Sequence, residues 1–528
     1  MLPSSSALPY RPLRLAAGAA VGIGIAGLIV LVLWSIATTA ASEPGGQSRV
    51  DVPGLLVMTA TQAGLTTVLS LAVGIAVAWA LNRLRFPGRD LIVGLFASAI
   101  VTPGIIVAFG LLAIWGRSGW VAELTGFRFP IFGLGGILFA HVILDATFAA
   151  RILLSRLDSV PPFRLKTGQS LGFSAWRRFA LIDWPAIRTT LPGLGAIIFL
   201  LAFTSFPVVL LLGGGPANQT LEVAIYSAVR LDFDLSAAVT LALVQIGVCA
   251  TIILLASAAA PIPANLGRSA GQDWRDAPLV QAVQWLVLIV AVVGFGLPLV
   301  AIIVDGLGPG LQTLLARESF WRSLWTSLAI ASASTLLTLL LGLTMATGRA
   351  ASGRHLVRTG IGAPAYAYLA VPAVVLSLGF FLLARNSGIE PTLAAPVVVV
   401  VANTLLALPY AISTLGPPLE AIAARRGKLI RSLGLSGWRQ FRAVEWPLIA
   451  GEVGVVAALA FCFSLGDLGV ISLFGTEDFS TLPLLMSRSL AAYRSNEAGG
   501  IAMVMLLLTI AAFVLIPKLF GRFADARS

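Results

Sequence analysis

Residues 166–185 read KTGQSLGFSAWRRFALIDWP, and residues 428–447 read KLIRSLGLSGWRQFRAVEWP. The two stretches lie 262 positions apart and are identical at ten of twenty positions. Self-similarity at one fixed offset is typical of a duplicated structural unit. The sequence is therefore interpreted as two related halves, each carrying one copy of this stretch.

The composition indicates that both halves lie in a membrane. Of the 528 residues, 58% are hydrophobic and 11% are charged, whereas a soluble domain carries about a quarter charged residues. This excludes a soluble globular enzyme and a disordered chain. We predict an all-α polytopic membrane protein, because a bilayer is crossed by about 20 apolar residues in a helix. The twelve candidate spans are roughly 15–40, 56–81, 91–115, 131–154, 189–213, 236–260, 278–303, 324–347, 362–384, 393–415, 448–474 and 498–518.

The first apolar run is interpreted as an uncleaved helix, since about 25 apolar residues exceed the 7–15 of a signal peptide. Basic residues then set the orientation. With the N-terminus in the cytoplasm, 26 of the 35 Lys and Arg residues fall on the cytoplasmic side and 9 on the other. The positive-inside rule places both termini in the cytoplasm. It also explains the net charge of +12 without a nucleic-acid partner.

Each copy of the repeated stretch follows the fourth span of a six-helix half and precedes the fifth. An even number of spans separates the copies, so both face the cytoplasm and the halves are parallel repeats. Gly172 and Gly434 predict a turn between two short helices, and Pro185 and Pro447 predict the end of the second helix. Such a segment lies on lipid or docks into a partner protein. The turn, present in both copies, favours docking.

The pattern G-x9-[IV]-x-W-P in both copies resembles the EAA loop of ABC-importer permeases. In that family the loop forms a coupling helix that inserts into the ATPase subunit. The resemblance carries over to eight residues: Gly172, Trp176, Phe179, Pro185, Gly434, Trp438, Phe441 and Pro447. The usual Glu-Ala-Ala is absent; residues 166–168 are KTG and residues 428–430 are KLI.

Three further segments resemble the thiamine/thiamine-pyrophosphate ABC transporter permeases: residues 204–238, 463–475 and 479–485. Fused double-length permeases of iron(III)-type importers share the architecture. The resemblance implies a MetI-like type I importer fold in the bacterial inner membrane. The implied partners are an ABC ATPase dimer in the cytoplasm, a periplasmic substrate-binding protein, membrane lipid and a small-molecule substrate.

The implied domain organisation has two transmembrane type-1 domains. They are residues 56–262 and 323–518. Residues 1–55 are a cytoplasmic tail with the first helix, 263–322 are a linker with the seventh helix and an outer loop, and 519–528 are a cytoplasmic tail. The semi-apolar stretches 221–229 and 482–492 are expected to be short periplasmic helices. The acidic residues of these outer loops, Glu222, Asp232, Asp234, Glu477, Asp478 and Glu497, are expected to steer the docking of the binding protein.

Four polar residues in the spans are candidates for the transport pathway: His141, Asp145, Asn403 and Asp467. Charged groups at the bilayer centre usually face a cavity or a partner. The alternative for Asp145 is a pair with His141 or Arg151 that stabilises the helix bundle. Asp467, in a segment that the resemblance places beside the pathway, is expected to help line the route of a cationic thiazolium substrate. The alternative is that it caps backbone amides at a helix end.

Several chemistries are not expected from this chain. None of its three lysines, Lys166, Lys428 and Lys518, lies in a phosphate-binding loop, so ATP and Mg²⁺ are assigned to the partner ATPase and no cofactor to this chain. Two dispersed histidines and the apolar Cys249 and Cys462 predict neither a metal site nor a disulfide. Catalysis is not expected.

The leading hypothesis is the permease subunit of a binding-protein-dependent importer of thiamine and its phosphate esters. An iron(III) or polyamine importer is the alternative within the class. An ion-coupled secondary transporter, using the carboxylates of Asp145 and Asp467, is the alternative from another class. A membrane-embedded enzyme is a third interpretation, for which the sequence offers no constellation of catalytic groups.

Overall fold

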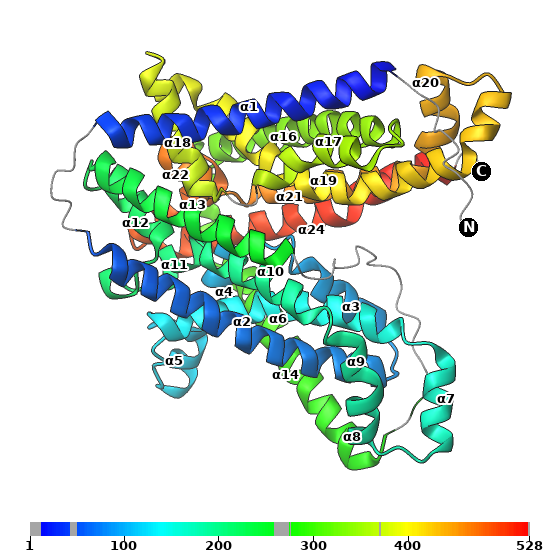
Figure 1. Cartoon of the computed structure of the whole chain (residues 1–528). Coiled ribbons are helices and arrows are strands. Elements are labelled where there is room, and N and C mark those ends of the chain that lie inside the picture. The colour runs from blue at the N-terminus through cyan, green and yellow to red at the C-terminus, as the bar shows by residue number, and fades with distance from the viewer. Residues whose placement is uncertain (1–11, 43–49, 258–273, 275, 369–370, 526–528) are drawn as a thin grey trace.

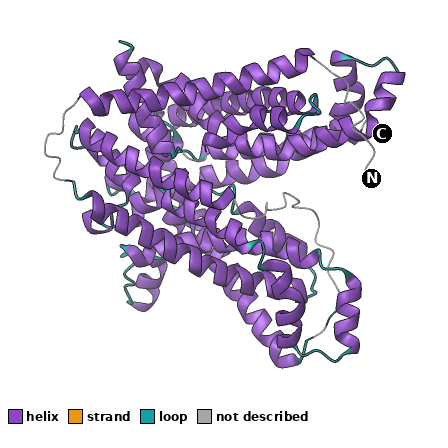
Figure 2. Cartoon of the chain, viewed as in Figure 1, coloured by secondary structure: helices purple, strands orange, loops and turns teal. Residues whose placement is uncertain are grey.

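The computed structural model describes residues 12–42, 50–257, 274, 276–368 and 371–525. Within these ranges the chain consists of helices and loops, with no strand (Figure 2). The start of the N-terminal tail, residues 258–260 of the sixth predicted run, most of the linker up to 273 and the last three residues lie outside the described ranges. The prediction of an all-α fold is confirmed for the described part of the chain.

The first half contains thirteen numbered α-helices. They are α1 (Pro12–Ser42), α2 (Val52–Arg83), α3 (Arg89–Ser98), α4 (Gly104–Trp115), α5 (Trp120–Thr125), α6 (Leu134–Asp158), α7 (Pro162–Ser170), α8 (Ala175–Arg178), α9 (Trp184–Ile187), α10 (Leu191–Phe203), α11 (Pro207–Leu212), α12 (Leu221–Arg230) and α13 (Leu235–Ser257).

The second half repeats this order with fewer breaks. Its helices are α14 (Pro278–Gly306), α15 (Gly310–Leu315), α16 (Glu318–Ala350), α17 (His355–Ala367), α18 (Ala373–Asn386), α19 (Pro391–Ser432), α20 (Gly437–Gln440), α21 (Trp446–Leu465), α22 (Gly469–Phe474), α23 (Leu482–Ala491) and α24 (Ser495–Asp525). The stretches predicted as short helices, 221–229 and 482–492, are α12 and α23.

Ten helical segments of the described chain are long and apolar enough to cross a bilayer, or eleven if a pair bent by 65° counts as one span. A polytopic membrane protein is therefore confirmed, while the count of twelve spans and the MetI-like fold stay predictions. The ninth predicted run, 362–384, does not form one helix. It is divided between α17 and α18, and Pro372 supplies the extended residue before α18, since proline offers no N–H to a preceding turn.

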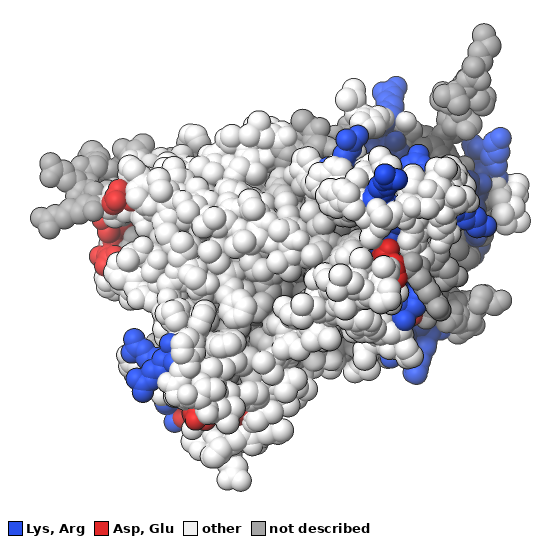
Figure 3. Space-filling view, turned by 90° about the horizontal axis from the view of Figure 1, so that it is seen from below, with Lys and Arg blue, Asp and Glu red and all other residues white. Residues whose placement is uncertain are grey.

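The surface agrees with a lipid environment. Large apolar side chains are exposed along the spans; for example, Val30 is 62% exposed and Trp34 is 67% exposed. Apolar exposure on this scale marks a surface that contacts lipid or protein. In Figure 3 uncharged surface fills the middle of the face, and charged side chains gather at its two ends.

Small residues bring the second and fourth helices of each half together. A Cβ on Gly74 of α2 would lie 2.7 Å from the Cβ of Ala149 in α6. A Cβ on Gly342 of α16 would lie 2.8 Å from the Cβ of Ala411 in α19. Close approach at small residues is how membrane helices pack. The same contact in both halves gives each a rigid pair of helices.

The repeated stretches lie at one end of the molecule. Figure 1 shows α7, α8 and α9 of the first copy at the lower right and α20 of the second at the upper right. We call this the loop end, defined by residues 158–187 and 420–449. The opposite end, which carries α5 and α12, is called the far end.

Candidate functional site

The two copies of the repeated stretch form a helix, a tight turn and a second helix. In the first copy, α7 ends at Ser170 and Gly172 turns the chain with φ +63°. In the second, α19 ends at Ser432 and Gly434 has φ +60°. This left-handed conformation is adopted by glycine at little cost. The predicted turn at both glycines is confirmed.

Each second helix presents an apolar side chain to the outside. Trp176 is 73% exposed and Trp438 is 70% exposed. Trp176 stacks on Phe179 with ring centroids 5.9 Å apart, and Trp438 stacks on Phe441 at 5.4 Å. Stacking fixes each tryptophan against its helix while one ring face stays open. Exposed aromatic patches held in this way are typical of protein docking sites.

The prediction that Pro185 and Pro447 end the second helices is wrong. In both copies one turn of π-helix precedes the Trp-Pro pair, at Phe179–Asp183 and at Phe441–Glu445. Each proline then takes an early position of the next α-helical segment, where its missing N–H is tolerated. The helix therefore continues through the proline, as far as Ile187 in the first copy and Leu465 in the second.

A buried cluster of charges anchors the first copy. Arg83, the last residue of α2, forms an ion pair with Asp183 of the π-helical turn. Arg178 contributes a second cation, with its Nε 3.7 Å from Oδ1 of Asp183. Its guanidinium also lies 4.4 Å from the ring centroid of Trp274. Arg178 is 1% exposed, and a buried cation requires such compensation.

In the second copy, Gln440 takes the position of Arg178 and Glu445 that of Asp183. Gln440 donates a hydrogen bond to Oε1 of Glu445. These anchoring residues were not identified from the sequence. The signal was present in the aligned repeats, where Arg178 and Gln440 are the one charged-to-neutral exchange on the buried side of the helix.

His141 lies at the centre of a polar contact in the first half. One ring nitrogen is 2.7 Å from the amide nitrogen of Gln62, and the other is 2.8 Å from the hydroxyl of Ser205. Both ring nitrogens are therefore used, and the alternative of a His141–Asp145 pair is wrong. One carboxylate oxygen of Asp145 is buried without a hydrogen-bond partner in the described part of the chain.

The second half places Asn403 and Asp467 at the positions of His141 and Ser205. Asn403 donates to the hydroxyl of Ser464 at 2.9 Å and faces Asp467. Asp467 lies between α21 and α22 and accepts the backbone N–H of Val470 at 3.1 Å. Asp467 therefore caps a backbone amide at a helix end, which is the alternative role that was considered from the sequence. Its second carboxylate oxygen is buried and has no partner among the described residues.

Two further residues join Asp467 from other elements. Glu222 of α12 is fully buried, and Tyr368 at the end of α17 is 2% exposed. The hydroxyl of Tyr368 lies within electrostatic range of the carboxylates of Glu222 and Asp467. The hydroxyl and the Oε2 of Glu222 have no hydrogen-bond partner within the described ranges. Polar atoms from both halves thus converge, and burial leaves them unsatisfied.

Glu222 corrects an expectation from the sequence. It is not an exposed acid of an outer loop, since its side chain is buried. Gln245 of α13 donates a hydrogen bond to its Oε1 at 2.9 Å. Burial raises the pKa of Glu222 to about 8, and hydrogen bonds from Gln245 and from the backbone of Val374 oppose that rise. A single acid within the otherwise apolar start of α12 was the available signal.

No group of three or more metal-ligating side chains occurs in the described part of the chain. Cys249 and Cys462 are buried and unpaired, as expected for thiols that pack as apolar groups.

No protein-family model matches the chain. It is 37% identical over 477 residues to the thiamine transport system permease protein ThiP of Salmonella typhimurium, across 88% of both chains. It is 38% identical over 477 residues to ThiP of Escherichia coli, across 87% of this chain and 88% of the relative. ThiP of Brucella melitensis is 35% identical over 464 residues, across 86% and 85%. Alignments of this length include residues from both halves.

Proposed function

The chain belongs to the family of thiamine transport system permease proteins, and from this premise we propose that it is the membrane subunit of an ATP-driven, binding-protein-dependent importer. Its substrate would be thiamine with its phosphate esters. ATP hydrolysis would occur on a separate ATPase, where ATP and Mg²⁺ bind.

The observation that carries this proposal is the pair of matching loops at one end of the molecule. Each offers an exposed tryptophan, Trp176 or Trp438, on a helix fixed by a glycine turn. Two equivalent surfaces suit a dimeric partner, because each subunit of the dimer would contact one of them. We therefore propose that these loops bind the two ATPase subunits and transmit their movement to the spans.

The loop end would face the cytoplasm of the bacterial cell and the far end the periplasm. The asymmetric distribution of Lys and Arg supports this orientation, with both termini inside. On the far end, Asp478 is 96% exposed at its side chain, and Asp232 and Glu477 are exposed as well. These carboxylates are proposed to steer the binding protein.

The pathway is proposed to pass the polar residues that both halves contribute. Asp467, Glu222 and Tyr368 have buried oxygens without partners, and a cationic thiazolium ring would satisfy them electrostatically. His141 and Asn403 would line the same route in the two halves. Asp145 is retained as a second candidate because its unpartnered oxygen also needs a counterpart.

Uptake of labelled thiamine into proteoliposomes tests the proposal, with the binding protein outside and the ATPase and ATP inside. Gly172→Glu combined with Gly434→Glu should abolish receptor-dependent uptake. A side chain at either position strains a left-handed turn by roughly 1–2 kcal/mol and adds a charge beside the docking surface. Gly388→Glu is the matched control, since Gly388 has φ +69° and open space around it, outside both loops.

The outcomes separate the alternatives. ATP hydrolysis stimulated by the binding protein without thiamine uptake would retain the importer and return the substrate to iron(III) or a polyamine. Uptake driven by an ion gradient without any ATPase would replace the importer by a secondary transporter.

A further inference from the structure

The first helix of each half packs against the other half. A Cβ on Gly18 of α1 would lie 2.9 Å from the Cα of Gly348 in α16, and one on Gly379 of α18 would lie 2.3 Å from Val32 of α1. In the opposite sense, a Cβ on Gly110 of α4 would lie 2.6 Å from the backbone oxygen of Pro298 in α14. Figure 1 shows α1 lying along α16, α17 and α18.

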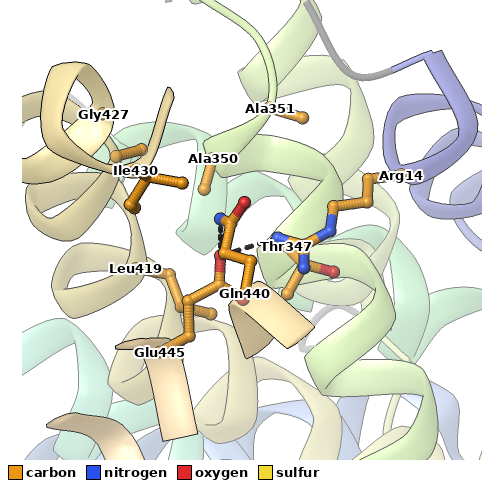
Figure 4. A pocket seen from close by; sticks show the side chains of 10 residues that line it. Arg14, Thr347, Ala350, Ala351, Leu419, Gly427, Ile430, Gln440 and Glu445 are labelled. Carbon is orange, nitrogen blue, oxygen red and sulfur yellow. Dashed lines mark hydrogen bonds and ion pairs between the residues drawn. The ribbon is translucent and has the colours of Figure 1, made fainter. Parts of the chain in front are cut away.

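The start of α1 reaches the loop of the second half. Arg14 donates from Nη1 to Oε1 of Glu445 at 2.7 Å and from Nη2 to the backbone oxygen of Gly437 at 3.1 Å. Figure 4 shows Arg14, Gln440 and Glu445 converging, with dashed lines between them. The side chain of Arg14 is 21% exposed and that of Glu445 is 6% exposed. The pair is therefore largely shielded from solvent.

The start of α14 reaches the loop of the first half in the same way. Asp276, two residues before α14, has its Oδ2 4.0 Å from Nε of Arg83. Its carboxylate also accepts a hydrogen bond from Gln284 at 2.6 Å. Asp276 thereby joins the cluster of Arg83, Arg178 and Asp183.

Arg14 is the third residue of α1 and Asp276 lies two residues before α14. They are therefore not aligned residues of the repeat, but each lies at the start of the first helix of its half, and their charges are opposite. The opposite charges match the loops that the two residues contact. The first loop has an additional cation, Arg178, and receives an acid; the second has the neutral Gln440 and receives a base. Each arrangement balances the charges buried at its loop, as buried ions require.

We propose that Arg14 and Asp276 are positioning residues, each of which ties the start of one half's first helix to the loop of the other half. This inference rests on the proposed role of the loops in binding the ATPase. α1 ends and α2 begins at the far end of the molecule, and α14 ends there beside α5, where Asp305 accepts a hydrogen bond from Trp120. A displaced loop would therefore pull on a helix that is covalently joined to the opposite half. The opposite charges would match each helix start to the loop of the other half that it contacts.

The test uses the full chain assembled with its ATPase and binding protein in proteoliposomes. Arg14→Glu should lower the thiamine taken up per ATP hydrolysed by about tenfold, the effect of about one shielded charge pair. Binding of the ATPase should change less than about twofold, since Trp438 and the glycine turn are untouched. Arg14→Lys and the charge exchange Arg14→Glu with Glu445→Arg should restore most of the ratio. Arg317→Glu is the control, because Arg317 pairs with Glu497 at 2.7 Å outside the loops.

A charge exchange that is no better than the single variants would overturn the proposal. Loss of ATPase binding in parallel with uptake would also overturn it, because the pair would then only maintain the fold of the loop. Thermal unfolding of the purified chain measures the coupling of Arg14 and Glu445 without any partner. It therefore separates failure of this pair from failure of the proposed function: a positive coupling with no ATPase binding by the wild-type chain overturns the proposed function alone.

Discussion

The two halves carry the same loop on differently shaped helices. In the first half, the helix from Ala175 to Ile187 meets α10 at a bend of 65°. In the second, helix runs from Gly437 through the π-helical turn to Leu465 without a break. Both begin with the same aromatic pair, and the path of the helix differs only beyond the Trp-Pro step. The duplicated sequence has thus kept an exposed tryptophan in each loop and changed the connection behind it.

The local sequence explains the bend. Residues 188–190 are Arg-Thr-Thr, followed by Leu191 and Pro192, where the second half has AGEVG at 450–454. Two β-branched threonines are poor helix formers, and Pro192 has no N–H to donate to the carbonyl of Arg188. The bend divides loop from span in the first half, whereas the second half joins them rigidly.

The largest expected difference between the halves is the contribution of the buried charges behind each loop to the free energy of unfolding. Arg178→Gln gives the first loop the residue of the second, but leaves Asp183 and Asp276 facing Arg83 alone. Removing one partner of a buried ion cluster costs about 3–5 kcal/mol. Thermal unfolding of the purified chain should show the loss, and adding Asp276→Asn should recover most of it.

The reciprocal change sharpens this comparison. Gln440→Arg places a second cation beside Arg14 and should destabilise the chain. If Arg178→Gln unfolds at the wild-type temperature, the cluster does not stabilise the first loop and the two halves do not differ in the proposed way.

The two loops are expected to contribute equally to ATPase affinity, although the helices behind them differ in shape. Trp176→Ala and Trp438→Ala should each weaken ATPase binding by about 2 kcal/mol, or about 30-fold in Kd, the effect of a central aromatic at an interface. Trp325→Ala is the control, since Trp325 is 66% exposed on a span outside both loops. Affinity of detergent-solubilised protein for the ATPase measures the effect. A tenfold difference between the two loop variants would show that the bend changes the surface.

Glu222 marks a difference between the far ends of the halves, because α23 has no acid in its first turn. Burial raises the pKa of Glu222 to about 8 from 4.5. The folded chain therefore retains a proton that the unfolded chain releases above about pH 4.5, and stability is lost as the pH rises towards 8. Glu222→Gln should unfold at a higher temperature than wild type at pH 9, by about 1 kcal/mol or more. The difference should vanish at pH 4, and its persistence there would assign it to packing instead.

The sequence predicted the features that repeat or have a period. Apolar run length predicted a polytopic helical chain but not its breaks, such as the one between α17 and α18. The shared Gly-to-Pro spacing predicted both loops and their turns. It did not predict that helix continues through Pro185 and Pro447, because a π-helical turn depends on packing rather than on composition. Nor did it predict the contacts of Arg14 with Glu445 or of Glu222 with Gln245, since these join residues far apart along the chain. His141 was identified, but its partner Gln62 lies in α2 and its partner Ser205 lies between α10 and α11.

The smallest expected effect concerns shape alone. A helix rises about 1.5 Å per residue, so spin labels at Arg439 and Phe463 in the continuous second helix should be roughly 36 Å apart. Labels at the repeat positions, Arg177 and Leu201, span the 65° bend, which shortens the separation to roughly 30 Å. Pro192→Ala restores a backbone N–H that can donate to the carbonyl of Arg188. It should lengthen the Arg177–Leu201 distance towards the Arg439–Phe463 distance and leave the latter unchanged, with a change in the free energy of unfolding below about 1 kcal/mol. Electron paramagnetic resonance distances on both labelled pairs measure it. An unchanged Arg177–Leu201 distance would mean that the packing of α10 against α2, and not the proline, holds the bend. The difference between the halves would then lie in their tertiary contacts.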